Sequence, residues 1–368
     1  MKVLTVIGAR PQFIKAAVVS RAIRETRGDM EEVVVHTGQH YDANMSDVFF
    51  DELEIPRPAY NLGIGGGTHG QNTGRMLEKL EELMLIEQPD WVLVYGDTDS
   101  TLAGALAASK LHIPVAHVEA GLRSFNRRMP EEINRILADH VSTKLFAPTE
   151  LAFDNLCNEG VPREKIEMVG DVMCDAAAFY KRRARKPIWF DDLGLKVSAF
   201  VLCTVHRAEN TDDPIRMRGI LEGLRKSEAQ VVLPLHPRTR GKLKQIGLML
   251  PSNVQAVDPV GYLEMIWLEA NCRLVATDSG GVQKEAYFNQ KYCVTLREET
   301  EWVELVQAGL NDVVGSDSEK IAAALRSHRE FASQSQFYGD GKAAKKIVNS
   351  FFSAEVGTEA IAGDDAQN

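Results

Sequence analysis

The sequence has few cysteines and no long apolar run. Its five cysteines are odd in number and none lies in a CxxC pair, so neither a disulfide framework nor a zinc site of clustered thiolates is expected. No apolar stretch approaches the roughly 20 residues that a membrane-spanning helix needs. Met1 leads directly into the strand-like VLTVIGAR instead of a signal peptide. We therefore expect a reduced, cytoplasmic protein without a membrane segment.

An excess of positive charge is also lacking. The chain has 42 lysines and arginines against 52 aspartates and glutamates, and its net charge is -10. This balance argues against a broad nucleic-acid-binding surface or a polybasic membrane surface, so an anionic ligand must be bound by local cations. Over 368 residues, 44% are hydrophobic and 26% are charged, which is typical of a folded globular protein. The length suggests two domains.

Short β-branched runs alternate with amphipathic segments along the chain. In the first half, VLTVI near Val3 and WVLVYGD from Trp91 read as buried parallel strands, and PQFIKAAVVSRAIRE from Pro11 has apolar residues at helical spacing. The alternation restarts in the second half with FVLCTVHR from Phe200 and RLVATDSGG from Arg273. The pattern predicts an α/β fold of two Rossmann-like, doubly wound domains whose strand ends face a cleft.

These patterns set approximate domain boundaries. We predict an N-terminal domain over residues 1–170 that carries the catalytic carboxylates, and a ligand-binding C-terminal domain over residues 171–350. Residues 351–368 are small, polar and acidic, and we expect this tail to fray. The cationic stretch YKRRARKPIWF from Tyr180 fits either a linker or a solvated helix end.

The turn after the first strand has the composition of an anion-binding site. Gly8 permits a tight exit from the strand, and Pro11 suits the first turn of a helix. Arg10 would then lie at a helix N-terminus, where its guanidinium suits a phosphate. Lys15 can lie on the same helix face. A surface arginine in an ordinary turn is an equally simple interpretation.

A second such turn is clearer. Ser279, Gly280 and Gly281 follow a strand-like run and precede a helical one. Without side chains at the glycines, backbone amides can approach a diphosphate, and the serine can cap the helix and bind an oxygen. Glu285, further along that helix, could accept hydrogen bonds from a ribose. A plain capped turn and a solvated glutamate are the alternatives.

The glycines of GGGTHG formally match the dinucleotide-binding pattern GxGxxG. Gly65, Gly67 and Gly70 do not follow the first strand of a complete βαβ unit, and so many glycines before a helix more often form a surface loop. We therefore expect no nicotinamide cofactor and no other cofactor.

Three carboxylates follow strands of the first half or open a helix. They are Asp97, Glu119 and Glu131. Carboxylates at one site raise one another's pKa and can divide acid and base duties. Asp97 could instead cap the next helix, and Glu131 could be a first-turn helix acid like its neighbour Glu132. Arg135 could keep these acids ionised or contact a ligand's phosphates.

Two histidines end strand-like runs of the second half. His206 lies in TVHRAEN and His236 in PLHPR, and an arginine follows each within two residues. Imidazole is a suitable acid, base or diphosphate donor near neutral pH. We expect at least one of them to face a ligand.

Seven motifs occur in one order between residues 8 and 286: GARPQFIK, YGDTDST, HVEAGLRS, PEEINR, VHRAEN, PLHPR and DSGGVQKEA. This order resembles the non-hydrolysing UDP-N-acetylglucosamine 2-epimerases. The resemblance implies a GT-B-like fold with UDP held mainly by the C-terminal domain and the sugar close to acids of the N-terminal domain. It also implies a cytoplasmic homodimer that supplies a polysaccharide pathway.

The resemblance further implies a reaction in which UDP is eliminated across C1 and C2 to a glycal and then added back, with a proton delivered to the opposite face. Which carboxylate removes the proton and which returns it stays open, and no metal is required. By motif, Arg10 and Ser279 would contact the diphosphate, Glu285 the ribose and His206 the phosphate or sugar, while Asp97, Glu119 and Glu131 would carry the proton transfers.

One segment departs from the family pattern. Common members have TERPE after the DSGG helix, whereas this chain has TEWVE from Thr300, with Trp302 in place of the arginine. Together with Gln12 and Phe13 after the first RP, this resembles the subgroup acting on UDP-2,3-diacetamido-2,3-dideoxyglucuronate, an O-antigen precursor. Arg127, Arg128 or Lys15 could supply the extra cation that a uronate needs.

Several alternatives stay open at this point. The substrate could be UDP-N-acetylglucosamine itself, or the chain could be an inverting GT-B glycosyltransferase, a hydrolysing variant or a catalytically silent UDP-sugar sensor. Gln39, His40 and Arg75 resemble parts of a second, activating UDP-sugar site known in some bacterial members.

Overall fold

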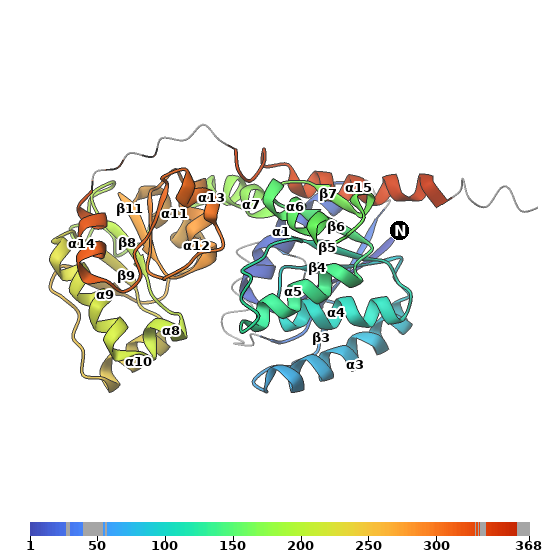
Figure 1. Ribbon diagram of the computed structural model, residues 1–368, viewed down its shortest axis with the longest axis horizontal. Helices are drawn as coiled ribbons and strands as arrows, with labels where there is room; N and C mark the ends of the chain where they lie inside the picture. Colours follow the sequence, from blue (N-terminus) through green and yellow to red (C-terminus); the bar gives the residue numbers. More distant parts are fainter. Residues whose placement is uncertain are drawn as a thin grey trace, which may run out of the picture. The chain divides into compact units, whose positions relative to one another are not determined.

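The computed structural model describes two compact units, each an α/β structure (Figure 1). One unit combines Met1–Ala176 with Gln336–Asn368, and the other is Ala177–Ser335. The structure describes residues 1–26, 30–39, 54–55, 57–327, 329, 331 and 336–358. The α/β prediction with two parallel sheets is confirmed.

The first unit is built on a seven-stranded sheet in which every recorded strand pair is parallel. Its order is β3-β2-β1-β4-β5-β6-β7, so the order reverses between β1 and β4. Val3, Leu4, Val6 and Ile7 of β1 are fully buried, as expected for a central parallel strand. The strands are β1 (Lys2–Ile7), β2 (Glu31–His36), β3 (Tyr60–Asn61), β4 (Trp91–Tyr95), β5 (Val115–Val118), β6 (Lys144–Ala147) and β7 (Ile166–Met168).

The helices of the first unit begin with recognisable signals. Thr68, Thr98 and Thr149 cap helices through their hydroxyls, and Pro11 and Pro130 lie in first turns. The helices are α1 (Arg10–Glu25), α3 (His69–Glu87), α4 (Asp99–Lys110), α5 (Pro130–Val141), α6 (Glu150–Asn158), the 3-10 turn η1 (Arg163–Lys165), α7 (Val172–Lys181), which runs on into the second unit, and α15 (Ala343–Thr358).

Helix α15 returns from the far end of the chain to the first unit (Figure 1). The ring of Phe351 lies edge-on to Trp91 and Phe146, with centroid distances of 5.3 and 6.2 Å. Asp175 accepts hydrogen bonds from the first two backbone amides of α15 at 3.1 and 2.9 Å. Residues 336–350, which the sequence-based boundaries assign to the second domain, therefore pack with the first. The helix continues into the predicted tail, whose residues 359–368 lie outside the described residues.

The second unit has a six-stranded parallel sheet with the order β10-β9-β8-β11-β12-β13, which reverses between β8 and β11. Its strands are β8 (Val201–Thr204), β9 (Val231–Pro234), β10 (Val254–Val257), β11 (Leu274–Thr277), β12 (Cys293–Thr295) and β13 (Asn311–Val313). Its helices are α8 (Ala208–Thr211), α9 (Pro214–Ser227), α10 (Pro237–Gln245), α11 (Tyr262–Asn271), α12 (Gly280–Phe288), α13 (Val303–Gln307) and α14 (Ser318–Arg326).

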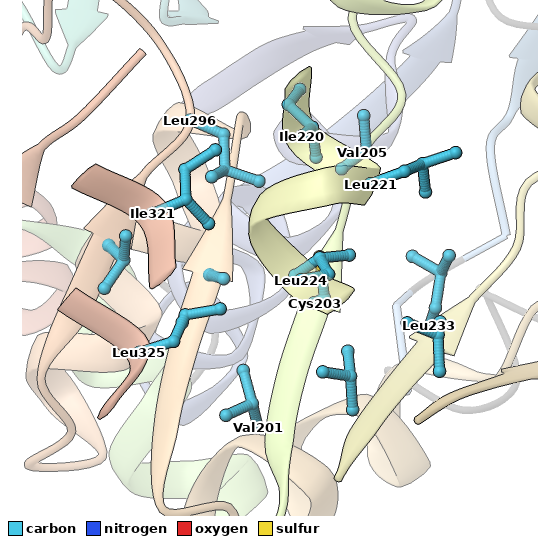
Figure 2. Close-up of a cluster of buried hydrophobic side chains, with 14 of the residues drawn as sticks. Val201, Cys203, Val205, Ile220, Leu221, Leu224, Leu233, Leu296, Ile321 and Leu325 are labelled. Atoms are coloured by element: carbon cyan, nitrogen blue, oxygen red, sulfur yellow. The ribbon is translucent and has the colours of Figure 1, made fainter. Parts of the chain in front are cut away.

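A buried apolar cluster joins β8, α9 and α14 of this unit (Figure 2). Val201 and Cys203 of β8, Leu224 of α9 and Ile321 of α14 belong to this cluster, and all four side chains are almost fully buried. A Cβ at Gly223 would lie 2.7 Å from Ile321, so glycine permits the close approach of the two helices.

The five cysteines are free, as their spacing predicts. Burial raises the pKa of the Cys272 and Cys293 thiols to about 12, so these groups stay protonated packing residues. No helix within the described ranges is long and apolar enough to cross a membrane.

Candidate active site

In each unit the strand order reverses at one point, and ligands of open parallel sheets bind beyond the carboxyl ends of the strands there. In the first unit, the point lies between β1 and β4. The turn after β4 carries Asp97, and the residue directly after β5 is Glu119. The strands thus bring these two predicted acids to one edge of the first sheet.

Glu119 forms an ion pair with Lys15 of α1. Both side chains are nearly buried, with exposed fractions of 11% for Lys15 and 8% for Glu119. The φ angle of Glu119 is +71°, an uncommon value for a residue with a side chain and one that often marks a functional site. A Cβ at Gly96 would lie 3.3 Å from Lys15 Nζ and 3.4 Å from Glu119 Oε2, so the β4 turn packs directly on this pair.

Arg135 of α5 holds the other acid. Its guanidinium pairs with Asp97 and, at 3.2 Å, with Glu132 Oε2. Burial disfavours the charge of Arg135, but the carboxylates of Asp97 and Glu132 outweigh burial and raise its pKa. Arg135 is therefore a permanent cation between two carboxylates.

The two neighbouring acids of α5 have different surroundings. Glu131 is exposed on the first turn and belongs to neither of the ion pairs above. Glu132 is 1% exposed and accepts hydrogen bonds from Ser124 N, Ser124 Oγ and Phe125 N at 2.9 to 3.0 Å. Glu132 thus fixes the preceding loop, and the structure brings Asp97 together with Glu132 instead of Glu131.

A buried network lies behind these acids. His117, fully buried on β5, approaches Asp139 Oδ1 through Nδ1 and the Gly96 carbonyl through Nε2, both at 2.7 Å. Arg123 pairs with the other oxygen of Asp139 at 2.7 Å. Burial alone would raise the pKa of Asp139, but His117 and Arg123 lower it, so the carboxylate stays ionised. The network fixes the carbonyl that precedes Asp97.

The predicted diphosphate turn of the second unit joins β11 to α12. Ser279 caps α12, with its Oγ 3.5 Å from Val282 N, and its own amide donates to Thr277 Oγ1 at 2.9 Å. The nearest atom to a Cβ at Gly281 would be Ser279 Oγ at 3.9 Å, and at Gly280 the nearest contacts would be 3.6 Å. Internal packing therefore requires neither glycine, and the lack of side chains at both suits the approach of a ligand to the backbone amides.

Asp278 joins this turn to the β8 exit, and the sequence reasoning did not single it out. Its fully buried carboxylate accepts hydrogen bonds from His206 N at 3.1 Å, Arg207 N at 3.0 Å and Asn210 Nδ2 at 3.1 Å. The carboxylate also lies 3.3 Å from His206 Nδ1, and the imidazole is 50% exposed. The first letter of DSGG could have signalled it, because an acid between a buried strand and a helix cap needs donors nearby.

Trp302, the departure from the family pattern, packs on the same turn. Its indole Nε1 donates to the Gly280 carbonyl at 2.8 Å. The Nζ atom of Lys284, a buried residue of α12, lies 4.2 Å from the centre of a Trp302 ring. Beside them, Arg297 binds Glu301 through two hydrogen bonds of 2.9 and 3.1 Å. Sequence reasoning missed these contacts.

The other predicted ligand residues lie on several elements. Glu285 is 8% exposed on α12, and His236 is exposed after β9. Arg10 is the first residue of α1, as predicted, but its side chain lies outside the described part of the structure. Among the described residues, no group of three or more histidine, cysteine or acidic side chains could hold a metal ion.

The residues of the predicted activating site are described in part. Gln39 Oε1 accepts hydrogen bonds from Ser100 N and Oγ at 3.1 and 2.7 Å. Arg75 is exposed on α3, and His40 lies outside the described residues. The activating site therefore stays a prediction.

A family model described as UDP-N-acetylglucosamine 2-epimerase matches residues 21–351. The chain belongs to this family. It is 59% identical, over 95% of its length and 98% of the relative's, to a UDP-2,3-diacetamido-2,3-dideoxy-D-glucuronate 2-epimerase of Pseudomonas aeruginosa. It is 52% identical, over the same shares of the two chains, to a UDP-N-acetylglucosamine 2-epimerase homolog of Methanococcus maripaludis.

A solved structure of this epimerase family is also similar. The UDP-GlcNAc 2-epimerase of Methanocaldococcus jannaschii, in complex with UDP-GlcNAc and UDP, matches with a TM-score of 0.87 and 43% identity over 96% of this chain and 100% of that one. The resemblance inferred from the seven motifs is therefore confirmed. This 2-epimerase is an isomerase with the two-domain fold that the motifs imply.

Proposed function

We propose that this 2-epimerase converts UDP-2,3-diacetamido-2,3-dideoxyglucuronate to its mannuronate epimer for O-antigen or related lipopolysaccharide synthesis. The observation that carries the proposal is the pair of strand-exit carboxylates, Asp97 and Glu119, each held by a nearly buried cation. The substrate follows from the 59% identity to the Pseudomonas aeruginosa enzyme with that name and from Trp302, which replaces the family arginine.

The proposed reaction has two balanced halves. A carboxylate takes the proton from C2, the C1–O bond breaks, and UDP leaves with the bonding electrons while C1 and C2 become doubly bonded. A second acid then returns a proton to C2 on the opposite face, and a phosphate oxygen of UDP bonds again to C1. Asp97, Glu119 and Glu131 are the candidates for these proton transfers. Glu119 is paired with Lys15 and Asp97 with Arg135, so each of these two candidates has a cation beside it.

The second unit would bind the nucleotide end of the substrate. The amides of the Ser279 turn and the N-terminus of α12 suit a diphosphate, and they would stabilise the charge that develops on departing UDP. Half-exposed His206, positioned by Asp278, is a donor to the same group or to the sugar. We assign Arg10 and His236 to the phosphates, Lys15 and Arg135 to the sugar end, and Glu285 to the ribose.

Proton NMR in deuterated water, with the uronate and with UDP-N-acetylglucosamine as separate substrates, tests the proposal. We expect deuterium at C2 and faster turnover of the uronate. Faster turnover of UDP-N-acetylglucosamine would refute the substrate, release of UDP with free sugar would indicate hydrolysis, and transfer to an acceptor without exchange would indicate a glycosyltransferase.

Three amide substitutions test the acids. Asp97→Asn, Glu119→Gln and Glu131→Gln should each lower kcat by about 10²- to 10⁴-fold, with UDP affinity retained. Glu164→Gln, at an exposed acid of η1, is the matched control and should leave kcat unchanged. An active Glu131→Gln variant would remove exposed Glu131 from the mechanism.

The family resemblance also leads us to propose a homodimer that acts in the cytoplasm. Light scattering on the purified protein should give twice the mass of one chain, and a monomer mass would contradict this part of the proposal. Cell fractionation, followed by activity measurement, tests the compartment.

A further inference from the structure

His69 and Asp99 form an imidazole–carboxylate pair to which neither the motifs nor the family resemblance assigned a role. His69 is the first residue of α3, and Asp99 is the first residue of α4. The Nδ1 atom of His69 lies 2.9 and 3.1 Å from the two carboxylate oxygens of Asp99. The Asp99 side chain is 4% exposed, whereas that of His69 is 67% exposed. A buried carboxylate therefore orients an imidazole whose other face is open to solvent.

This pair adjoins the proposed proton-transfer group. Asn134 Nδ2 donates to the Asp97 carbonyl and to Asp99 Oδ1, both at 3.1 Å. Only one side-chain amide therefore separates the Asp99 carboxylate from the backbone of Asp97. The next residue on α5, Arg135, holds the Asp97 side chain. His69 thus lies at the exposed rim of the turn that carries Asp97.

The charges at this edge suggest what His69 can bind. Lys15 and Arg135 are nearly buried and each is already paired with carboxylates of the chain. His69 differs, because its partner binds Nδ1 and leaves Nε2 on the exposed part of the ring. In the imidazolium form both ring nitrogens donate, so the ring can give the Nδ1 proton to Asp99 and the Nε2 proton to an anion.

We propose that His69, oriented by Asp99, binds the carboxylate of a UDP-uronate and makes the enzyme prefer it to the corresponding neutral sugar. This inference rests on the proposed function, because it concerns the same sugar. The carboxylate of a hexuronate is carried by C5, across the ring from C2. A donor at the rim of the Asp97 turn is suited to reach that side of the ring while an acid acts at C2. Asp99 and Asn134 are positioning residues in this arrangement.

The test compares two substrates that differ only at C6, the diacetamido uronate and UDP-2,3-diacetamido-2,3-dideoxyglucose. The variants are His69→Leu, which removes the donor, and His69→Gln, which retains a neutral N–H. We expect His69→Leu to lower kcat/KM for the uronate about tenfold or more, mainly through KM, and His69→Gln to have a smaller effect. Turnover of the neutral sugar should be unchanged in both variants.

His140→Leu is the matched control. His140 is also an exposed histidine with its Nδ1 engaged, 2.9 Å from the Ile136 carbonyl, but it lies near the far end of α5. The His140→Leu variant should turn over both substrates as the wild type does. If His69→Leu lowers kcat/KM equally for the two substrates, His69 acts in proton transfer or folding and the inference is overturned. If the KM for the uronate is unchanged, the inference is also overturned. If the wild-type enzyme does not turn over the uronate, the proposed function fails, and the inference fails with it.

Discussion

Replacing Gly281 with alanine tests the proposed diphosphate turn, because the substitution separates ligand binding from folding. Gly281 lies on the first turn of α12, and a Cβ there would meet nothing closer than Ser279 Oγ at 3.9 Å. The methyl group therefore fits the unliganded protein. Alanine favours a helix over glycine by about 0.5–1 kcal/mol, so we expect the free energy of unfolding to rise by up to that amount.

The same methyl group should weaken UDP binding. It would occupy the space through which a phosphate approaches the backbone amides of the turn, and a lost charged hydrogen bond is worth about 1.5–3 kcal/mol. We expect the Kd for UDP to rise at least about tenfold, equivalent to about 1.4 kcal/mol. Isothermal titration with UDP and urea unfolding measure the two effects separately.

Gly241→Ala is the control for this experiment. Gly241 is exposed on α10 of the same unit, and a Cβ there would have no neighbour within 4 Å. This variant should gain similar stability and keep the wild-type affinity for UDP. If Gly281→Ala is equally stable and binds UDP as the wild type does, the turn is not the phosphate site and the reasoning is refuted.

Three further substitutions test the surrounding structure. Gly8→Ala would place a methyl group 2.1 Å from Thr37 Oγ1 and 2.3 Å from Ser100 Oγ. Urea unfolding should therefore show a free energy of unfolding lower by about 1–3 kcal/mol. An unchanged urea midpoint would contradict this packing. Glu32 has a buried Oε2 without a hydrogen-bond partner among the described residues, and burial raises its pKa above the ordinary 4.5. The raised pKa of Glu32 stabilises the folded protein at low pH, and this contribution is lost as pH rises. In thermal unfolding, Glu32→Gln should therefore be more stable than wild type at pH 7.5, and the difference in stability should shrink toward pH 4. A difference that does not change with pH would contradict this prediction. Trp302→Phe removes the indole donor to the first glycine of the turn, and titration should show UDP binding weakened about three- to tenfold; wild-type affinity would mean that the turn needs no such support.

The sequence predicted the parts of the site that depend on local order along the chain. Asp97, Glu119 and Ser279 each follow a β-branched run, and the carboxyl ends of parallel strands meet at one edge of a sheet. Their positions therefore followed from the pattern of strands and helices. The α/β fold was predictable for the same reason, since both halves repeat that pattern.

The partners of these residues were not predictable in the same way. Glu131 and Glu132 are adjacent first-turn acids, and a rotation of about 100° between them decides which one is buried against the preceding loop. Tertiary packing of α5 sets which of the two residues faces inward. Likewise, the spacing of α1 showed that Lys15 could reach the anion turn, but its pairing with Glu119 joins residues 104 positions apart.

The last helix was misassigned for a related reason. Residues 336–350 follow the second domain in the sequence and were assigned to it, whereas Phe351 packs on Trp91 and Phe146 of the first unit. Contacts over such a separation leave no periodic signal in the local sequence.

The return of α15 has a consequence for how the protein is made. During translation, the strands of the first unit leave the ribosome early, but the helix that covers Trp91 and Phe146 is synthesised only after the whole of Ala177–Ser335. The second unit is one continuous insert and can fold while the nascent chain is still growing. The first unit must wait with an uncovered aromatic surface until the final helix emerges.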